Sequence, residues 1–153
     1  MIEEINTEDY EYAGFWNRFW ATMIDSILIL MITIPISMTV YEDFLLNESI
    51  ILGPADVFIN YVLPCIAIII FWLYKGATPG KMALNIIIVD ATSGGKLSVA
   101  QSIGRYFAYI PATLPLFLGL FWVAWDKRKQ GWHDKLANTV VIKKIKKEAV
   151  EFK

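Results

Sequence analysis

Two long apolar segments limit most strictly what this chain can fold into. Residues 19–40 contain a single charged residue, Asp25, and residues 57–74 contain none. An α-helix rises about 1.5 Å per residue, so each segment is long enough to cross a hydrocarbon core of roughly 30 Å. We therefore expect two transmembrane helices, the second one kinked at Pro64. The composition agrees, since 56% of the residues are hydrophobic, which is more than a soluble domain normally contains.

A third apolar segment, residues 106–125, is also uncharged, but Pro111, Pro115 and Gly119 interrupt any helix drawn through it. The loop at 41–56 has four acids and no lysine or arginine, which favours the outer side of the membrane. Basic residues follow the second helix, which favours the cytoplasmic side for them. A single third crossing would export the basic C-terminal segment. We therefore favour a re-entrant or broken-helix hairpin over a full span, with both termini cytoplasmic.

The sequence predicts one membrane domain with a charged tail at each end. Residues 1–13 form an acidic N-terminal tail, residues 14–142 one membrane domain, and residues 143–153 a basic C-terminal tail. Residues 83–96 combine a β-branched run with a glycine-containing turn, which predicts a short cytoplasmic β-hairpin or a strand followed by a turn. The predicted fold is an all-α integral membrane protein of the cytoplasmic membrane, a small helical bundle with that hairpin attached.

The charge pattern and the scarcity of reactive side chains exclude several functions. Residues 1–74 carry a net charge of −9 and residues 75–153 one of +8, so the chain lacks the broadly basic surface of a nucleic-acid-binding protein. One cysteine, Cys65, and one histidine, His133, cannot supply a zinc site or a disulfide framework. We therefore expect no enzyme, no cofactor and no bound metal centre, and we expect the basic cluster at 143–147 to bind anionic lipid headgroups.

The first apolar segment carries one polar stripe. Arg18 and Asp25 are seven residues apart, which places them on the same face of a helix. A lone carboxylate at membrane depth costs about 2.5–3.5 kcal/mol, so Asp25 needs a partner or a proton. It either binds a cation or relays a proton, with Arg18 or a basic residue of another segment beside it, or it forms a structural contact. The same arc contains Thr22, Ser26, Thr33 and Ser37.

The sequence GATPGK at residues 76–81 superficially resembles a phosphate-binding loop. A Walker A motif needs four residues between its glycines and a serine or threonine after its lysine, whereas here there are three residues and Met82 follows. We predict a tight turn in which Gly80 supplies conformational freedom and Lys81 meets a lipid phosphate or a carboxylate.

Residues 126–135 contain the remaining candidate polar side chains. His133 and Asp134 are adjacent, but a metal phosphohydrolase requires several histidines and this chain has one. We expect Asp134 to pair with Arg18 or Arg105. His133 is predicted to form structural hydrogen bonds, and a pH-sensing role for it stays open because the ordinary pKa of histidine is near 6.5.

Together these residues resemble the RDD family of prokaryotic integral membrane proteins, named for one arginine and two aspartates. The resemblance spans residues 13–142 and implies that Arg18 is the arginine, Asp25 the first aspartate, and Asp134, or less favourably Asp126, the second. At Asn138, where we expect glycine, asparagine tolerates the same positive φ. The resemblance implies a role in transport without a settled ligand, and no enzymatic motif accompanies it. Its fragments are AGF at 13–15, Arg18, Ala21, Asp25, GATPGK at 76–81, Arg105 and GWHDKLANTVV at 131–141.

Two hypotheses about function follow. The first is a transporter or binder of a cation, coupled to protons, that uses Arg18, Asp25 and Asp134 and works as a homo-oligomer because so few helices cannot enclose a path. The second is a membrane scaffold that anchors or stabilises a partner, in which the same residues only fix packing. The residues predicted to support the first are Thr22, Lys81, Arg105, Asp126 and His133.

Overall fold

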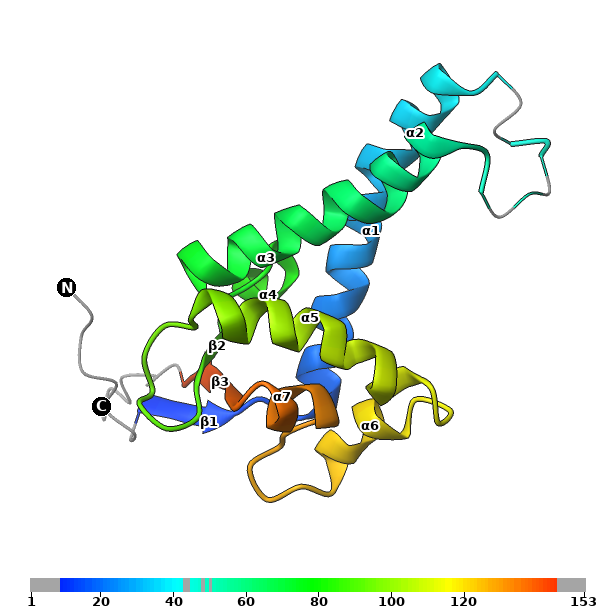
Figure 1. Ribbon diagram of the computed structural model, residues 1–153. Helices are drawn as coiled ribbons and strands as arrows, with labels where there is room; N and C mark the ends of the chain where they lie inside the picture. The colour runs from blue at the N-terminus through cyan, green and yellow to red at the C-terminus, as the bar shows by residue number, and fades with distance from the viewer. Residues whose placement is uncertain (1–8, 43–44, 48, 50, 146–153) are drawn as a thin grey trace, which may run out of the picture.

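The computed structural model describes residues 9–42, 45–47, 49 and 51–145. Two long apolar helices dominate its shape (Figure 1). The first is α1, Phe15–Val40, and the second is built from α2, Pro54–Val57, the π-helical turn η2, Phe58–Val62, and α3, Leu63–Lys75. The two helices approach each other near α2 and diverge toward their other ends (Figure 1). Both are long and apolar enough to cross a membrane, as the sequence predicts.

The second helix is irregular before Pro64 rather than at it. The chain leaves regular α-helical geometry in η2 and returns to it at Leu63. A proline ring clashes with the carbonyl group four residues earlier, here that of Asn60, and the wider π-helical turn accommodates this clash.

The remaining elements gather at one end of the two helices (Figure 1). The helix α5 begins with a capping box, as Ser98 Oγ accepts a hydrogen bond of 3.1 Å from Gln101 N and Gln101 Oε1 accepts one of 2.9 Å from Ser98 N. The elements are β1, Tyr10–Tyr12, α4, Pro79–Ala83, β2, Ile86–Asp90, α5, Val99–Thr113, α6, Leu118–Phe121, the 3-10 helix η3, Trp122–Ala124, α7, Trp132–Leu136, and β3, Thr139–Lys144.

The third apolar segment is broken, as predicted. The axes of α5 and of the α6–η3 helix differ by 114°. The break contains Pro115, and both Leu116 and Phe117 adopt positive φ, whereas Pro111 is accommodated inside α5. This shape fits either a broken span or a re-entrant loop.

Residues 83–96 contain a strand followed by a turn, as one of the two alternatives predicted, and the other alternative, a local hairpin, is wrong. The strand β2 pairs with β3, and β1 pairs with the other edge of β3, so the antiparallel sheet has the order β1-β3-β2. Both β2 and β3 are rich in β-branched residues, and their buried side chains, such as Ile88 and Val141, pack into the core with Trp72. The fold is therefore mostly helical with a small antiparallel sheet, rather than all-α.

The two predicted tails are also corrected in part. Residues 10–12 form strand β1, and Lys143 and Lys144 belong to β3. Residues 1–8 and the rest of the basic tail, Lys146 and Lys147 included, lie outside the described residues.

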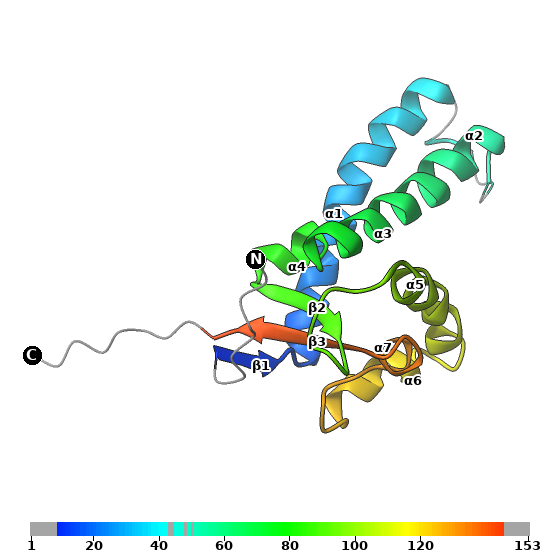
Figure 2. The same cartoon turned by 60° about the vertical axis from the view of Figure 1, so that its left-hand side comes forward.

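The sheet brings together segments that flank all three apolar stretches. The strand β1 precedes α1, β2 follows α3, and β3 follows the α5–α6 segment. Figure 2 shows the three strands together at one end of the molecule, with the α1–α2 connection at the other. The start of α1, the end of α3 and the segments flanking α5–η3 therefore lie at the same end.

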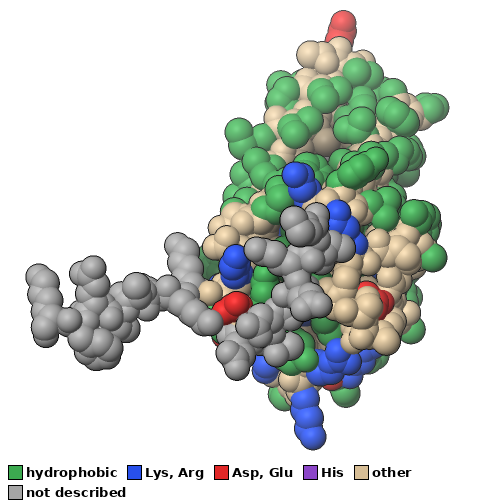
Figure 3. All heavy atoms as spheres, turned by 90° about the vertical axis from the view of Figure 1, so that its left-hand side faces the viewer, with side chains coloured by type: hydrophobic (Ala, Val, Ile, Leu, Met, Phe, Trp, Pro, Cys, Tyr) green, Lys and Arg blue, Asp and Glu red, His purple; other side chains and the backbone are tan. Residues whose placement is uncertain are grey.

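The surface divides along the same direction. Figure 3 shows hydrophobic side chains over the two long helices and lysine and arginine side chains around the end that carries the sheet. Exposed apolar residues on the long helices include Leu30, Met31, Ile66 and Ile70. This pattern is typical of helices that face lipid, with basic groups at headgroup level.

Candidate functional site

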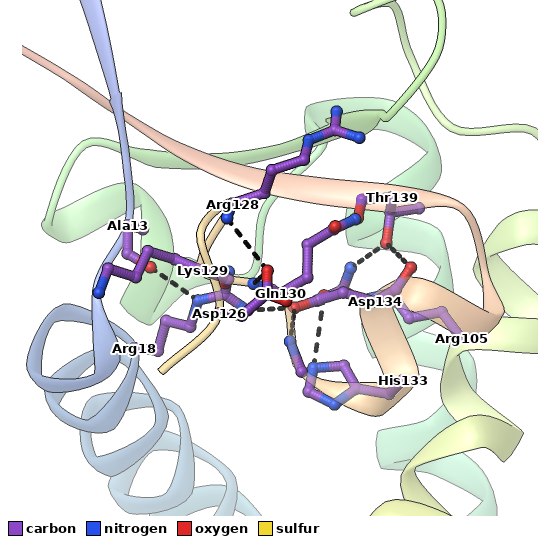
Figure 4. Close-up of polar contacts among 11 residues, drawn as sticks. Ala13, Arg18, Arg105, Asp126, Arg128, Lys129, Gln130, His133, Asp134 and Thr139 are labelled. Atoms are coloured by element: carbon purple, nitrogen blue, oxygen red, sulfur yellow. Dashed lines mark hydrogen bonds and ion pairs between the residues drawn. The ribbon is translucent and has the colours of Figure 1, made fainter. Parts of the chain in front are cut away.

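Asp134 is the centre of a buried ionic cluster (Figure 4). Its carboxylate, on α7, is fully buried and pairs with Arg18 from α1 and, at 2.6 Å, with Arg105 from α5. Gly131 N donates a further hydrogen bond of 2.9 Å to it. The two pairings that the sequence predicts as alternatives for Asp134 therefore occur together.

The two arginines extend the cluster to other elements. Arg105 is fully buried, donates a hydrogen bond of 2.6 Å to Thr139 Oγ1 in β3, and lies over the ring of Trp72 at 5.3 Å. Arg18 donates to the carbonyl oxygen of Ala13 at 3.0 Å and to that of Lys129. The cluster thus joins α1, α3, α5, α7 and the sheet.

The surroundings of Asp134 and His133 determine whether each of these two side chains is charged. Burial alone would raise the pKa of the Asp134 carboxyl, but Arg105 and Arg18 outweigh it and hold that pKa below its ordinary range. Burial lowers the pKa of His133 to about 3, against the opposing effect of Asp134. His133 is therefore neutral at neutral pH, with its ring stacked on Tyr109 at 4.1 Å.

Asp126 has a separate role in the loop before α7. It pairs with Lys135 and accepts hydrogen bonds of 3.1 Å from the backbone N–H groups of Arg128 and Gln130. The hydrogen bond from Lys135 is the main cause that lowers the pKa of Asp126. The geometry therefore places Asp134, rather than Asp126, beside Arg18.

Asp25 lies in a second cluster, apart from the arginines. Its Oδ2 accepts a hydrogen bond of 2.5 Å from Thr78 Oγ1, and its Oδ1 accepts one of 2.7 Å from Gly80 N. Among the described residues, no lysine, arginine or histidine nitrogen lies within 4.0 Å of this carboxylate. The structure thus separates Asp25 from Arg18, although the two share a helix.

The GATPGK segment folds differently from the predicted tight turn. Its residues 79–83 form α4, which packs on α1. At Gly80 a Cβ atom would lie 2.1 Å from the carbonyl oxygen of Ala21, so glycine is required there for close approach. The glycine of this segment that needs a positive φ is Gly76, which ends α3 with φ of 67°.

Lys81 points into the protein rather than toward lipid phosphate. It is buried, and its Nζ donates a weak hydrogen bond of 3.5 Å to Thr78 Oγ1. No carboxylate of a described residue lies within 4.0 Å of that nitrogen. Burial is the main cause that lowers the pKa of Lys81, and Arg105 and Arg18 add to it against Tyr109 and Asp25.

A cavity of about 520 Å³ connects these side chains. It lies between α1, α3 and α5, and α4 closes one side. Asp25 and Lys81 are its charged lining residues, and most of the remainder are apolar or aromatic. Its hydroxyl-bearing residues from α1, α4 and α5 are Thr22, Ser26, Thr78, Tyr106, Tyr109 and Thr113.

The sequence reasoning did not single out Asp56, which is buried near the far end of the two helices. In the sequence Asp56 is only an acid at the start of an apolar segment, and acids are common at helix N-termini for electrostatic reasons.

Within the described part of the chain, no group of three or more histidine, cysteine, aspartate or glutamate residues could hold a metal ion.

Comparison with known proteins identifies relatives along nearly the whole chain. The model of the RDD family matches residues 12–138. An uncharacterized protein of Rickettsia prowazekii, RP437, is 34% identical over 86% of this chain and 96% of its own length. The uncharacterized protein YxaI of Bacillus subtilis is 32% identical over 86% and 97%, respectively. The uncharacterized membrane protein YteJ of the same organism is 26% identical over 92% and 86%. No solved structure matches the chain significantly.

Proposed function

The chain belongs to the RDD family, and on that premise we propose that it binds a small cation at Asp25 and carries it across the cytoplasmic membrane in exchange for a proton. The observation that carries this proposal is the cavity of about 520 Å³ in which Asp25 and Lys81 are the charged lining residues. A carboxylate in an apolar cavity attracts a cation, because neutralising it removes the cost of a buried charge.

The coupling to protons follows from Lys81. Asp134 pairs with both arginines, so their cluster keeps an excess of positive charge. While Lys81 is protonated, it adds to that charge and repels a second cation from the cavity. When Lys81 releases its proton, the Asp25 carboxylate is left without a nearby counter-charge and can accept the cation. Burial favours this release, since it lowers the pKa of Lys81.

The Thr78 hydroxyl links the two groups. It donates to Asp25 at 2.5 Å and accepts from Lys81 at 3.5 Å. A cation that binds Asp25 would replace the hydrogen bond from the Thr78 hydroxyl and so disturb the contact between Thr78 and Lys81. Binding of the cation at Asp25 and of the proton at Lys81 would therefore oppose each other.

The proposal includes a topology of two spans, α1 and Pro54–Lys75, with α5–α6 re-entrant. The common sheet supports it, because β2 and β3 flank the α5–α6 segment and are hydrogen-bonded to each other. A segment whose two ends join one small sheet enters and leaves from the same side. The exposed Lys75 and Lys96 at that end favour the cytoplasmic side and contact with anionic headgroups.

We expect the transporting unit to be a homo-oligomer, since two spans and a re-entrant segment provide few helices to enclose a path. The alternative function is a non-transporting scaffold. The cluster around Asp134 favours the scaffold function for those residues, because a largely buried ionic network that links several elements is suited to hold them together.

Binding of sodium to the purified protein tests the proposal. The affinity of the wild type should rise with pH below 10.5, the ordinary pKa of lysine, since burial lowers the pKa of Lys81 and the side chain loses its proton below that value. Lys81→Met should remove this pH dependence, and Asp25→Asn should abolish binding at the cavity. Lys75→Met, at an exposed lysine, is the matched control and should behave as wild type. Unchanged binding in Asp25→Asn, or unchanged pH dependence in Lys81→Met, would overturn the proposal.

A further inference from the structure

A second buried carboxylate, Asp56, lies at the end of the two helices away from the sheet. It is 4% exposed. Its Oδ1 accepts a hydrogen bond of 2.6 Å from Asn60 Nδ2, and its Oδ2 accepts one of 3.3 Å from Leu52 N. Within the described part of the chain, no lysine, arginine or histidine nitrogen lies within 4.0 Å of it. The charge of Asp56 is therefore buried without an ionic partner.

The side chain of Asn60 connects Asp56 to the first helix. The same Nδ2 that donates to Asp56 also donates a hydrogen bond of 3.1 Å to Ser37 Oγ, and Ser37 is fully buried on α1. Asn60 lies in the π-helical turn η2. Turns of this kind re-aim side chains and are frequent at functional sites. The Asn60 amide thus lies between a carboxylate oxygen and a hydroxyl oxygen.

We propose that Asp56, Asn60 and Ser37 form a second binding site for a monovalent cation. This inference rests on the proposed function, because it adds an outer station to the same transport path. The amide nitrogen of Asn60 lies 2.6 Å from Asp56 Oδ1 and 3.1 Å from Ser37 Oγ. The space between these two oxygens therefore favours a positively charged group. A half-turn of that amide presents Asn60 Oδ1 instead, and the three residues then offer oxygen ligands only.

The chemistry of this set selects the class of ion. Carboxylate, amide and hydroxyl oxygens are the ligands that hard cations prefer. The site has one negative charge among its named ligands, which a monovalent ion neutralises and a divalent ion leaves in excess. Tyr41 adds a neutral oxygen nearby, since its hydroxyl accepts a hydrogen bond of 3.2 Å from Asp56 N.

The position of the site relative to Asp25 supports a shared path. Ser37 follows Asp25 by twelve residues, which corresponds to about 18 Å along a helix. Between them lie Ser26, which lines the cavity, and Thr33, which is buried at 3% exposure. The polar face of α1 therefore extends from the cavity to Asp56, and a cation arriving from the end opposite the sheet meets Asp56 before Asp25.

A purely structural role predicts a different result on substitution. The same contacts fasten α1 to η2, and Asp56 also lies in the first turn of α2. Asn in place of Asp56 removes the charge and keeps one oxygen to accept the hydrogen bond of 2.6 Å from Asn60, while the weaker one of 3.3 Å from Leu52 N is lost. A structural contact therefore keeps its main hydrogen bond in Asp56→Asn, whereas a cation site loses its only charged ligand.

The experiment counts sodium ions bound per chain at about pH 9, by equilibrium dialysis of the full-length protein in detergent. Asp56→Asn and Asp25→Asn should each bind one ion fewer than wild type, and the double variant none. Ser37→Ala, which keeps the carboxylate, should weaken the outer site by about tenfold. Thr39→Ala, at an exposed hydroxyl on the same helix, is its control.

The outcomes separate this inference from the proposed function. Wild-type stoichiometry in Asp56→Asn, or wild-type affinity in Ser37→Ala should Asp56→Asn fail to fold, would overturn the outer site. If the wild type binds one ion that is lost only in Asp25→Asn, the proposed function stands and the outer site is wrong. If that ion is lost only in Asp56→Asn, the outer site stands and the assignment of Asp25 is wrong.

Discussion

The hydroxyl of Thr78 donates a hydrogen bond of 2.5 Å to the carboxylate of Asp25. This contact joins the segment after the second long helix to the first, and it gives the Asp25 carboxylate a hydrogen-bond donor other than an arginine. Arg18 is consequently available to pair with Asp134. Arg18, Asp25 and Asp134 therefore belong to two clusters, the ionic one around Asp134 and the one in which Asp25 lines a cavity.

Close approach of α4 to α1 depends on Gly80. In Gly80→Ala the new methyl group would lie 2.1 Å from the Ala21 carbonyl oxygen and 2.9 Å from Asp25 Cγ. We expect the free energy of unfolding in mixed micelles to fall by about 1–3 kcal/mol, as for other overpacked sites. Gly104→Ala, where no atom lies within 4 Å of the added Cβ, is the control and should not destabilise the protein. Equal stability of the two variants would contradict the docking of α4.

The ion pair between Arg18 and Asp134 should show strong coupling. Asp134→Asn should lower the free energy of unfolding by about 3–5 kcal/mol, because it leaves two arginines without their counter-charge, whereas Arg18→Gln should cost less, because Asp134 keeps its pair with Arg105. The double variant should lose less than the sum, since either single change already removes the contact between the two residues. Additive losses would mean that the two residues do not meet.

The exposed ion pair between Lys135 and Asp126 is the comparison for the buried pair of Arg18 and Asp134. The Lys135 side chain is 44% exposed and pairs with Asp126. Lys135→Gln should therefore cost less than about 1 kcal/mol.

Acid should destabilise the protein through His133. Its pKa is about 3 in the folded protein and 6.5 when unfolded, so between these values the unfolded chain binds the extra proton. Stability therefore falls as the pH falls, by about 2 kcal/mol from pH 6.5 to pH 5. Thermal unfolding across this range measures it. His133→Phe keeps the ring beside Tyr109 and should flatten the slope, and an unchanged slope would assign the effect elsewhere.

Topology can be read with single cysteines in a Cys65→Ser background. Cysteines at Asn47, Lys96 and Glu148, the last outside the described residues, are labelled on intact cells with an impermeant thiol reagent. Two spans with a re-entrant α5–α6 segment predict labelling at Asn47 alone. Labelling at both Asn47 and Glu148 would instead establish three full spans.

Much of the helical framework follows from local sequence. The two apolar stretches predict long helices, and the structure contains two that are long and apolar enough to cross a membrane. The prolines predict the break before α6. The turn before β3 keeps its shape with asparagine, since Asn138 adopts φ of 51°. These features depend on segment length and on backbone preferences of single residues, which are visible without the rest of the fold.

The sheet and the partner of Asp25 could not be read in the same way. The pairing of β2 with β3 joins segments some 50 residues apart, and a β-branched run followed by a glycine turn is also what a local hairpin looks like. Asp25 and Arg18 share a helix face, which favours their pairing by periodicity alone. The closer hydrogen bonds from Thr78 and Gly80 arise only once α4 docks on α1.

Proton-coupled sodium flux in liposomes tests the central claim most directly. A sodium gradient imposed on the reconstituted wild type should drive a change of internal pH. Asp25→Asn should fold and insert normally, because asparagine keeps an acceptor for Gly80 N, yet should lose at least about tenfold of this flux since it lacks the charge. Glu11→Gln, at an exposed acid, should retain it. Full flux in Asp25→Asn, or no flux in the wild type, would contradict cation exchange at this cavity.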